Sequence, residues 1–87
     1  MAFSRADVRA ELTTILKRHV APDVAVSQAS TIVGDLGLDS LAVMEVIADV
    51  EDRFHVTIPE DALPEIRTVG DVAAALERHL AAKGELS

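Results

Sequence analysis

Eleven residues decide the fold of this chain, and they read as a turn that runs into a helix: Asp35-Leu36-Gly37-Leu38-Asp39-Ser40-Leu41-Ala42-Val43-Met44-Glu45. Gly34 and Gly37 permit a backbone path that residues with a Cβ resist. Asp39 is suited to cap the helix, because its carboxylate can accept a hydrogen bond from an early helical N–H. No Gly or Pro interrupts residues 40–54, so one helix is predicted there. The Ser40 hydroxyl is then free at the helix tip; the alternative is that Ser40 itself is the cap.

This predicted helix carries two apolar faces. An inward stripe about 100° wide is expected to hold Val43, Val46, Ile47, Val50 and Phe54. A smaller strip on the solvent side has Ser40 at its top and consists of Leu41, Met44 and Ala48. Four acids surround that strip: Glu45, Asp49, Glu51 and Asp52. The pattern favours partner docking, although three scattered surface apolar residues, or residues covered by neighbouring loops, would read the same way.

The N-terminal part of the sequence predicts a helix and then a long loop. Ser4 can cap the helix, with Asp7 at the capping-box position. Its apolar stripe consists of Val8, Leu12, Ile15 and Leu16. Pro22-Asp23 is expected to stop the helix. Residues 24–34 keep no period and are expected to lie over the bundle as a loop anchored by Val26, Ile32, Val33 and Leu36.

The C-terminal part predicts two more helices. Residues 56–58 are expected to be extended loop, and a short helix follows Pro59 and ends before Pro64, with Leu63 and Ile66 plugging the core. Thr68 can cap the last helix, whose stripe consists of Val69, Val72, Ala73, Leu76 and Leu80. The sequence therefore predicts a single domain over residues 1–87, with a core from about residue 4 to 81 and a frayed tail from Ala81.

Composition and charge restrict the possible functions. The chain has 87 residues, no cysteine, and no apolar run of membrane-spanning length, so we expect one small monomeric domain in the cytoplasm. The net charge is −7. Residues 35–61 contain eight acids and only one base, Arg53, while acids and bases cancel elsewhere. Such an acidic centre repels nucleic acid and anionic membranes and attracts basic protein surfaces.

The residue types do not support catalysis by the chain itself. A serine hydrolase needs a base and an oxyanion hole, but no Gly-x-Ser-x-Gly occurs, and the three histidines fall near predicted helix ends. Their spacing matches no usual zinc pattern. Asp35 and Asp39 lack the further ligands of a calcium-binding EF-hand loop. We therefore expect neither enzymatic activity nor a metal site.

The motif resembles the phosphopantetheine attachment signature of acyl carrier proteins. The resemblance rests on Asp-Leu-Gly-Leu-Asp-Ser-Leu at residues 35–41, with Glu45 five residues after the serine. Further along, Phe54, Ile58-Pro59-Glu60 and Thr68-Val69 fall where that family ends its second helix and begins its third and fourth. The resemblance covers essentially the whole chain, most closely residues 34–80. It implies an all-α four-helix bundle with three longer helices, one short helix and a long first loop.

The resemblance also implies a function. Ser40, flanked by Asp39 and Leu41, would carry 4′-phosphopantetheine attached by a separate phosphopantetheinyl transferase that uses coenzyme A and magnesium. The thiol of this arm would hold acyl groups as thioesters for partner enzymes such as a ketosynthase, acyltransferase or ligase. Leu41, Met44, Glu45 and Ala48 match positions that such partners touch, and Asp49 and Asp52 extend the predicted docking surface.

One departure bears on the pathway. Many fatty-acid-synthase carriers place an acid two residues after the modified serine, whereas this chain has Ala42. Ser-Leu-Ala-x-Met-Glu is more similar to carriers of polyketide or related secondary pathways. A stand-alone aminoacyl or peptidyl carrier shares the fold and the modification and stays open. The alternative from a different class is an acidic helical adaptor that is never modified.

Overall fold

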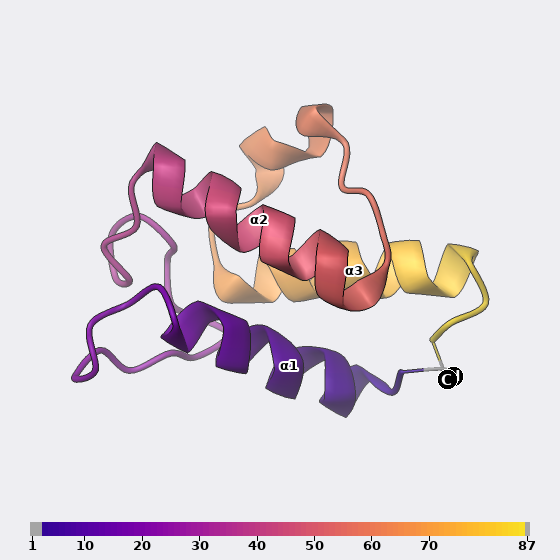
Figure 1. Ribbon diagram of the computed structural model, residues 1–87, viewed down its shortest axis with the longest axis horizontal. Coiled ribbons are helices and arrows are strands. Elements are labelled where there is room, and N and C mark those ends of the chain that lie inside the picture. The colour runs from indigo at the N-terminus through magenta and orange to yellow at the C-terminus, as the bar shows by residue number, and fades with distance from the viewer. Residues whose placement is uncertain (1–2, 87) are drawn as a thin grey trace.

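A computed structural model describes residues 3–86. Within these residues the elements are α1 (Arg5–Lys17), α2 (Ser40–Phe54), the 3₁₀-helix η1 (Glu60–Glu65) and α3 (Val69–Ala82). Helix α1 packs against both α2 and α3. In Figure 1, η1 lies on the side of α2 and α3 that faces away from α1. In the described part of the chain, β pairing is limited to two isolated bridges. The predicted all-α class, with three longer helices and one short one, is confirmed.

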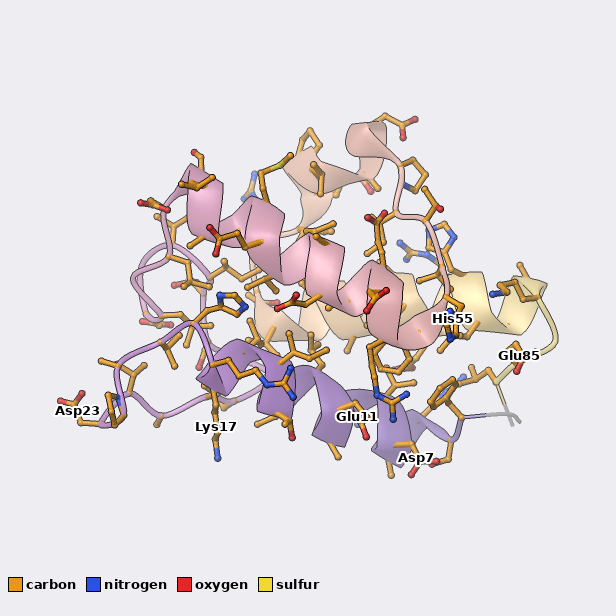
Figure 2. All side chains as sticks on the ribbon, viewed as in Figure 1. Asp7, Glu11, Lys17, Asp23, His55 and Glu85 are labelled. Atoms are coloured by element: carbon orange, nitrogen blue, oxygen red, sulfur yellow. The ribbon has the colours of Figure 1, made fainter. Side chains whose placement is uncertain are left out.

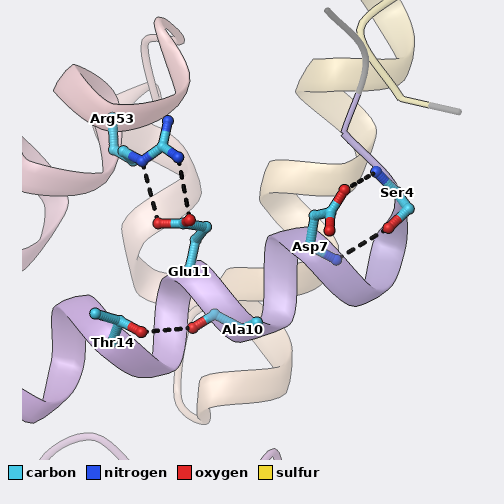
Figure 3. Close-up of polar contacts among 6 residues, drawn as sticks. All are labelled: Ser4, Asp7, Ala10, Glu11, Thr14 and Arg53. Atoms are coloured by element: carbon cyan, nitrogen blue, oxygen red, sulfur yellow. Dashed lines mark hydrogen bonds and ion pairs between the residues drawn. The ribbon is translucent and has the colours of Figure 1, made fainter.

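Side-chain caps fix where the three long helices begin. Ser4 Oγ accepts a hydrogen bond from the Asp7 N–H at 3.0 Å, while Asp7 Oδ2 accepts one from the Ser4 N–H at 3.1 Å (Figure 3). Thr68 and Asp71 form the same reciprocal box at the start of α3. Each box satisfies backbone donors that the helix itself leaves without a partner. The predicted helix starts are therefore confirmed.

The core is aliphatic, with one aromatic pair at its end. The inward stripe of α2 is buried as predicted, except that Val43 is only partly buried. Phe54 is 1% exposed and meets the Phe3 ring edge-on, with the ring centroids 5.0 Å apart. Above this pair, Arg53 donates two hydrogen bonds to the Glu11 carboxylate, each 3.1 Å long, and so links α2 to α1 (Figure 3). Charged side chains such as Lys17 and Asp23 point away from this core in Figure 2.

The long first loop is anchored differently from the prediction. Ile32 and Leu36 are buried, as expected, and Leu38 joins them, but Val33 is 70% exposed. The cause is a tight turn in which the N–H groups of residues 35 and 36 both donate to the Thr31 carbonyl, leaving Val33 on its outer side. The turn is held against the start of α3 by the hydrogen bond from the Ile32 N–H to the Arg67 carbonyl, 2.9 Å long.

One predicted helix end is confirmed and one needs correction. Helix α1 ends at Lys17, close to His19, which lies near its predicted end, and i→i+3 bonds from residues 18 and 19 tighten its last turn. Element η1 does not stop before Pro64 but contains it. The Ala62 N–H donates to the Pro59 carbonyl, and the Ile66 N–H donates to the Leu63 carbonyl. Neither hydrogen bond requires a donor at residue 64, so the N–H that proline lacks is not needed.

The C-terminal tail takes a defined path up to residue 86. Helix α3 continues to Ala82, and Gly84, at φ 73°, reverses the chain. The Glu85 N–H then donates to the Leu80 carbonyl at 2.8 Å. Leu86 forms a bridge with Phe3 and packs partly buried against the core. The two ends of the described chain therefore meet, at the right of Figure 1. Ser87 lies outside the described residues.

Candidate functional site

Ser40 is the first residue of α2, and its hydroxyl is not used to build the helix. The Asp39 carboxylate caps α2 by accepting a hydrogen bond from the Ala42 N–H at 2.8 Å, which confirms the predicted cap. Ser40 is exposed, and no hydrogen bond within residues 3–86 engages its side chain. Ser40 Oγ is therefore an accessible hydroxyl at a helix tip.

The turn before Ser40 is held by backbone geometry and by a side-chain pair. Gly37 has φ 69°, a conformation that side-chain-bearing residues rarely adopt. A Cβ at Gly34 would lie 2.8 Å from Thr31 Oγ1, closer than real Cβ atoms approach. Thr31 and Asp35 exchange two hydrogen bonds, of 2.8 and 2.9 Å, between side chain and backbone. Gly34, Gly37 and Asp35 therefore fix the conformation of the turn that leads into α2 and Ser40.

The predicted apolar strip lies on the surface of α2. Leu41 is 69% exposed and Met44 is 55% exposed, and Ala48 is exposed as well. Leu41, Met44 and Val33 are the large apolar side chains that are exposed among the described residues. Exposed apolar residues that lie together can mark a site of protein contact. The strip runs along the helix directly from Ser40, so a protein that reaches this hydroxyl would also contact the strip.

The acids around the strip differ in whether another group of the protein contacts them. His19 Nε2 lies 2.8 Å from Asp49 Oδ2, and its Nδ1 lies 3.9 Å from Glu45 Oε2, so one imidazole bridges two predicted docking acids. Glu51 accepts a hydrogen bond from the Ile58 N–H at 2.8 Å and so holds the loop after α2. Asp52 is exposed. Sequence reasoning missed the contact of His19, which depends on how α1 packs against α2.

A pocket of about 480 Å³ opens beside Ser40, between the Thr31 turn, the start of α2, and η1 with the two residues that follow it. Its size is in the range of small-molecule pockets. Three polar residues border it: Thr31, Ser40 and Arg67. The other lining residues are apolar: Ile32, Val33, Val43, Met44, Leu63 and Ile66. An apolar group attached to Ser40 could therefore be buried against the apolar walls of this pocket.

The Asp71 carboxyl serves the fold. The backbone N–H groups of Arg67 and Thr68 hold the pKa of the Asp71 carboxyl below its usual value of 3.8. This carboxyl belongs to the cap of α3. Within residues 3–86, no three His, Cys, Asp or Glu side chains gather as metal ligands would, and none of the helices there has the length and apolarity needed to cross a membrane.

Comparison with known proteins gives related sequences over most of the chain. Residues 6–76 match the family described as phosphopantetheine attachment site. The chain is 34% identical over 79 residues to the meromycolate extension acyl carrier protein of Mycolicibacterium aurum, covering 90% of this chain and 81% of that protein. It is 51% identical over 43 residues to the acyl carrier protein of Exiguobacterium sibiricum. That second match spans only about half of either protein, 49% of this chain and 54% of the relative.

The fold is shared as well. A solved structure assigned as an acyl carrier protein from Mycobacterium tuberculosis superposes with a TM-score of 0.74 at 29% sequence identity. The superposition covers 79% of this chain and 93% of the other. The similarity therefore includes the arrangement of the helices around the motif as well as the motif itself.

Proposed function

This chain belongs to the acyl carrier protein family, and we propose that Ser40 is the residue that receives its 4′-phosphopantetheine arm. The thiol at the end of the arm holds acyl groups as thioesters, and the protein delivers them to partner enzymes without catalysing a reaction itself. The observation that carries the proposal is the exposed Ser40 hydroxyl, which capping leaves unused, beside an apolar pocket.

The attachment asks little of this chain. Ser40 Oγ attacks the phosphorus that bears the pantetheine in coenzyme A, the bond to adenosine 3′,5′-bisphosphate breaks, and the hydroxyl proton leaves to a base of the transferase. The Asp39 cap and the Gly37 turn keep the serine at an accessible tip. Coenzyme A and the transferase would meet the carrier in the cytoplasm, which is the location we propose.

The partners are proposed to dock on α2. Leu41, Met44 and Ala48 supply an exposed apolar strip, and Glu45, Asp49 and Asp52 supply negative charge beside it. A partner with a small apolar contact and a basic rim fits this surface, because charge complementarity orients the encounter and apolar contact adds affinity. These partners are the phosphopantetheinyl transferase and the enzymes that load or receive acyl groups, such as a ketosynthase, an acyltransferase or a ligase.

For the pathway we propose polyketide or related secondary metabolism ahead of fatty acid synthesis. Ala42 supports this preference, because the acid that many fatty-acid-synthase carriers have at this position is missing. A carrier for aminoacyl groups is the next candidate. Loading assays with a malonyl-transferring and an amino-acid-activating enzyme would distinguish an acyl carrier from an aminoacyl carrier, because only the matching enzyme should acylate the arm.

The experiment that tests the proposal is intact-mass measurement before and after incubation with coenzyme A, magnesium and a broad-specificity phosphopantetheinyl transferase. We expect a gain of one phosphopantetheine, which peptide mapping assigns to Ser40. Ser40→Ala should gain nothing, and Ser27→Ala, at an exposed serine outside the motif, should be modified like the parent. A folded parent protein that gains no mass would refute the carrier proposal. Partner binding that is the same in Ser40→Ala would then favour an unmodified acidic adaptor.

A further inference from the structure

The pocket beside Ser40 combines apolar walls with a single charged residue. Arg67 is the only charged side chain among the described residues that line it, and Thr31 adds one hydroxyl. Ser40, Val43 and Met44, which line the same pocket, belong to residues 35–61, where eight acids and only one base occur. An acyl chain carried on Ser40 would therefore meet one basic residue and no acid among the described residues that line the pocket.

The backbone of Arg67 is fixed while its guanidinium is left available. Its carbonyl accepts the hydrogen bond from the Ile32 N–H at 2.9 Å, and its N–H donates to Asp71 Oδ2 at 3.0 Å. Both bonds use backbone atoms, so neither depends on the side chain. Within residues 3–86 no ion pair or side-chain hydrogen bond engages the Arg67 guanidinium; Asp71 is influenced by its charge only at longer range. The guanidinium N–H donors of this lining residue therefore have no partner among the described residues.

The physical chemistry of such a pocket discriminates between acyl groups. An alkyl chain gains from burial against the apolar walls. A chain that also carries a carbonyl or carboxylate oxygen loses hydration on entering, unless a donor replaces the lost water. A guanidinium supplies that donor, and its bonds to a charged or strongly polar oxygen are stronger than those between neutral groups.

We propose that Arg67 is a specificity-determining residue, which binds a carbonyl or carboxylate oxygen on an acyl chain lodged in the pocket beside Ser40. The pocket then prefers acyl groups with an apolar body and an oxygen along or at the end of the chain over plain alkyl groups of the same length. This inference rests on the proposed attachment of the arm to Ser40. A phosphate oxygen of the arm itself has the same acceptor chemistry, so the test separates the two sources.

The test compares five forms of the protein: unmodified, bearing the arm alone, and bearing the arm loaded with a hexanoyl, a 3-oxohexanoyl or an adipyl chain. In the three loaded forms a stable amide replaces the thioester. Intact mass first establishes that each arm is on Ser40. Thermal unfolding and the Nε–Hε NMR signal of Arg67 are then measured. We expect the two oxygenated chains to raise the melting temperature by about 5 °C more than hexanoyl does, and to move the Arg67 signal where hexanoyl does not.

Substitutions identify the group responsible. Arg67→Gln should remove the advantage of the oxygenated chains and leave the hexanoyl effect in place, and its backbone bonds to Ile32 and Asp71 allow it to fold. Arg67→Lys should keep part of the advantage for the adipyl chain, whose carboxylate attracts any cation. Arg78→Gln is the matched control, because Arg78 is an exposed arginine of α3 that does not line this pocket.

Three results would overturn the inference, and each differs from failure of the carrier proposal, which would appear as no mass gain. The oxygenated and alkyl chains could stabilise the protein equally. Arg67→Gln could weaken all chains alike, which would show a purely structural role. The Arg67 signal could move completely when the arm alone is attached, with no further change on acylation, which would make the phosphate of the arm the ligand.

Discussion

The division of labour between Asp39 and Ser40 leads to a prediction with a matched pair of variants. Asp39 caps α2 through a hydrogen bond of 2.8 Å to the Ala42 N–H, whereas the Ser40 hydroxyl supports nothing within residues 3–86. Asp39→Ala should therefore lower the free energy of unfolding, while Ser40→Ala should change it little. The second variant should nevertheless lose all modification by the transferase, which Asp39→Ala can still accept.

The magnitude follows from the capping bond and the helix dipole. Replacing an N-cap aspartate by alanine costs about 1 kcal/mol, and the lost negative charge at the helix start adds on the order of 0.5 kcal/mol at low ionic strength. In a domain of this size each kcal/mol lowers the melting temperature by roughly 4–8 °C, so Asp39→Ala should melt about 6–12 °C lower. Ser40→Ala should remain within about 0.5 kcal/mol of the parent, as surface substitutions usually do.

The assay is urea and thermal unfolding followed by far-ultraviolet circular dichroism, with both variants and the parent in low and high salt. High salt should reduce the effect of Asp39→Ala, because the dipole part is screened. If Ser40→Ala loses as much stability as Asp39→Ala, the serine hydroxyl is the working cap, and the reasoning that leaves it free for modification fails.

Three further predictions concern other parts of the molecule. Phe54→Ala should destabilise the protein by about 3–5 kcal/mol, because it leaves a cavity and removes the edge-on contact with Phe3; a melting temperature equal to that of the parent would contradict the packing. Met44→Glu should slow acyl transfer to partner enzymes without changing the melting temperature, since Met44 is 55% exposed; unchanged kinetics with several partners would argue against docking on α2. Asp71 has a lowered pKa in the folded state, so the folded protein binds fewer protons than the unfolded chain, and the stability it provides is present above pH 3.8 and is lost as the pH falls through the folded pKa. Asp71→Asn should therefore show a smaller loss of stability on acidification than the parent in acid titrations of the melting temperature, and an equal loss would assign the acid sensitivity to other groups.

Local features of the sequence were sufficient to predict α2 and its cap. The chemistry of Asp39 and the uninterrupted residues 40–54 act over one or two helical turns, and the structure reproduces both. The alternation of buried and exposed positions along α2 likewise depends only on helical spacing. For this reason the accessible Ser40 and the strip beginning at Leu41 could be placed before any tertiary contact was known.

Features that depend on distant segments could not be predicted in this way. Val33 lies on the outer side of its turn, and the side of that turn that faces the protein is fixed by the bond from the Ile32 N–H to the Arg67 carbonyl, far along the chain. His19 meets Asp49 only because α1 and α2 pack together, and a histidine near a helix end carries no local sign of that contact. The pocket is formed by three separate segments, so neither its volume nor the position of Arg67 at its edge follows from the spacing of any one motif.

The meeting of Phe3 and Leu86 has a practical consequence for handling the protein. These residues form a bridge at one end of a molecule 34 Å long, and α2 begins at the other end in Figure 1. A linker, label or solid support attached next to Phe3 or Leu86 therefore holds the molecule by the side remote from Ser40. Immobilised in this way, the carrier should present its serine and the exposed surface of α2 to added enzymes without obstruction.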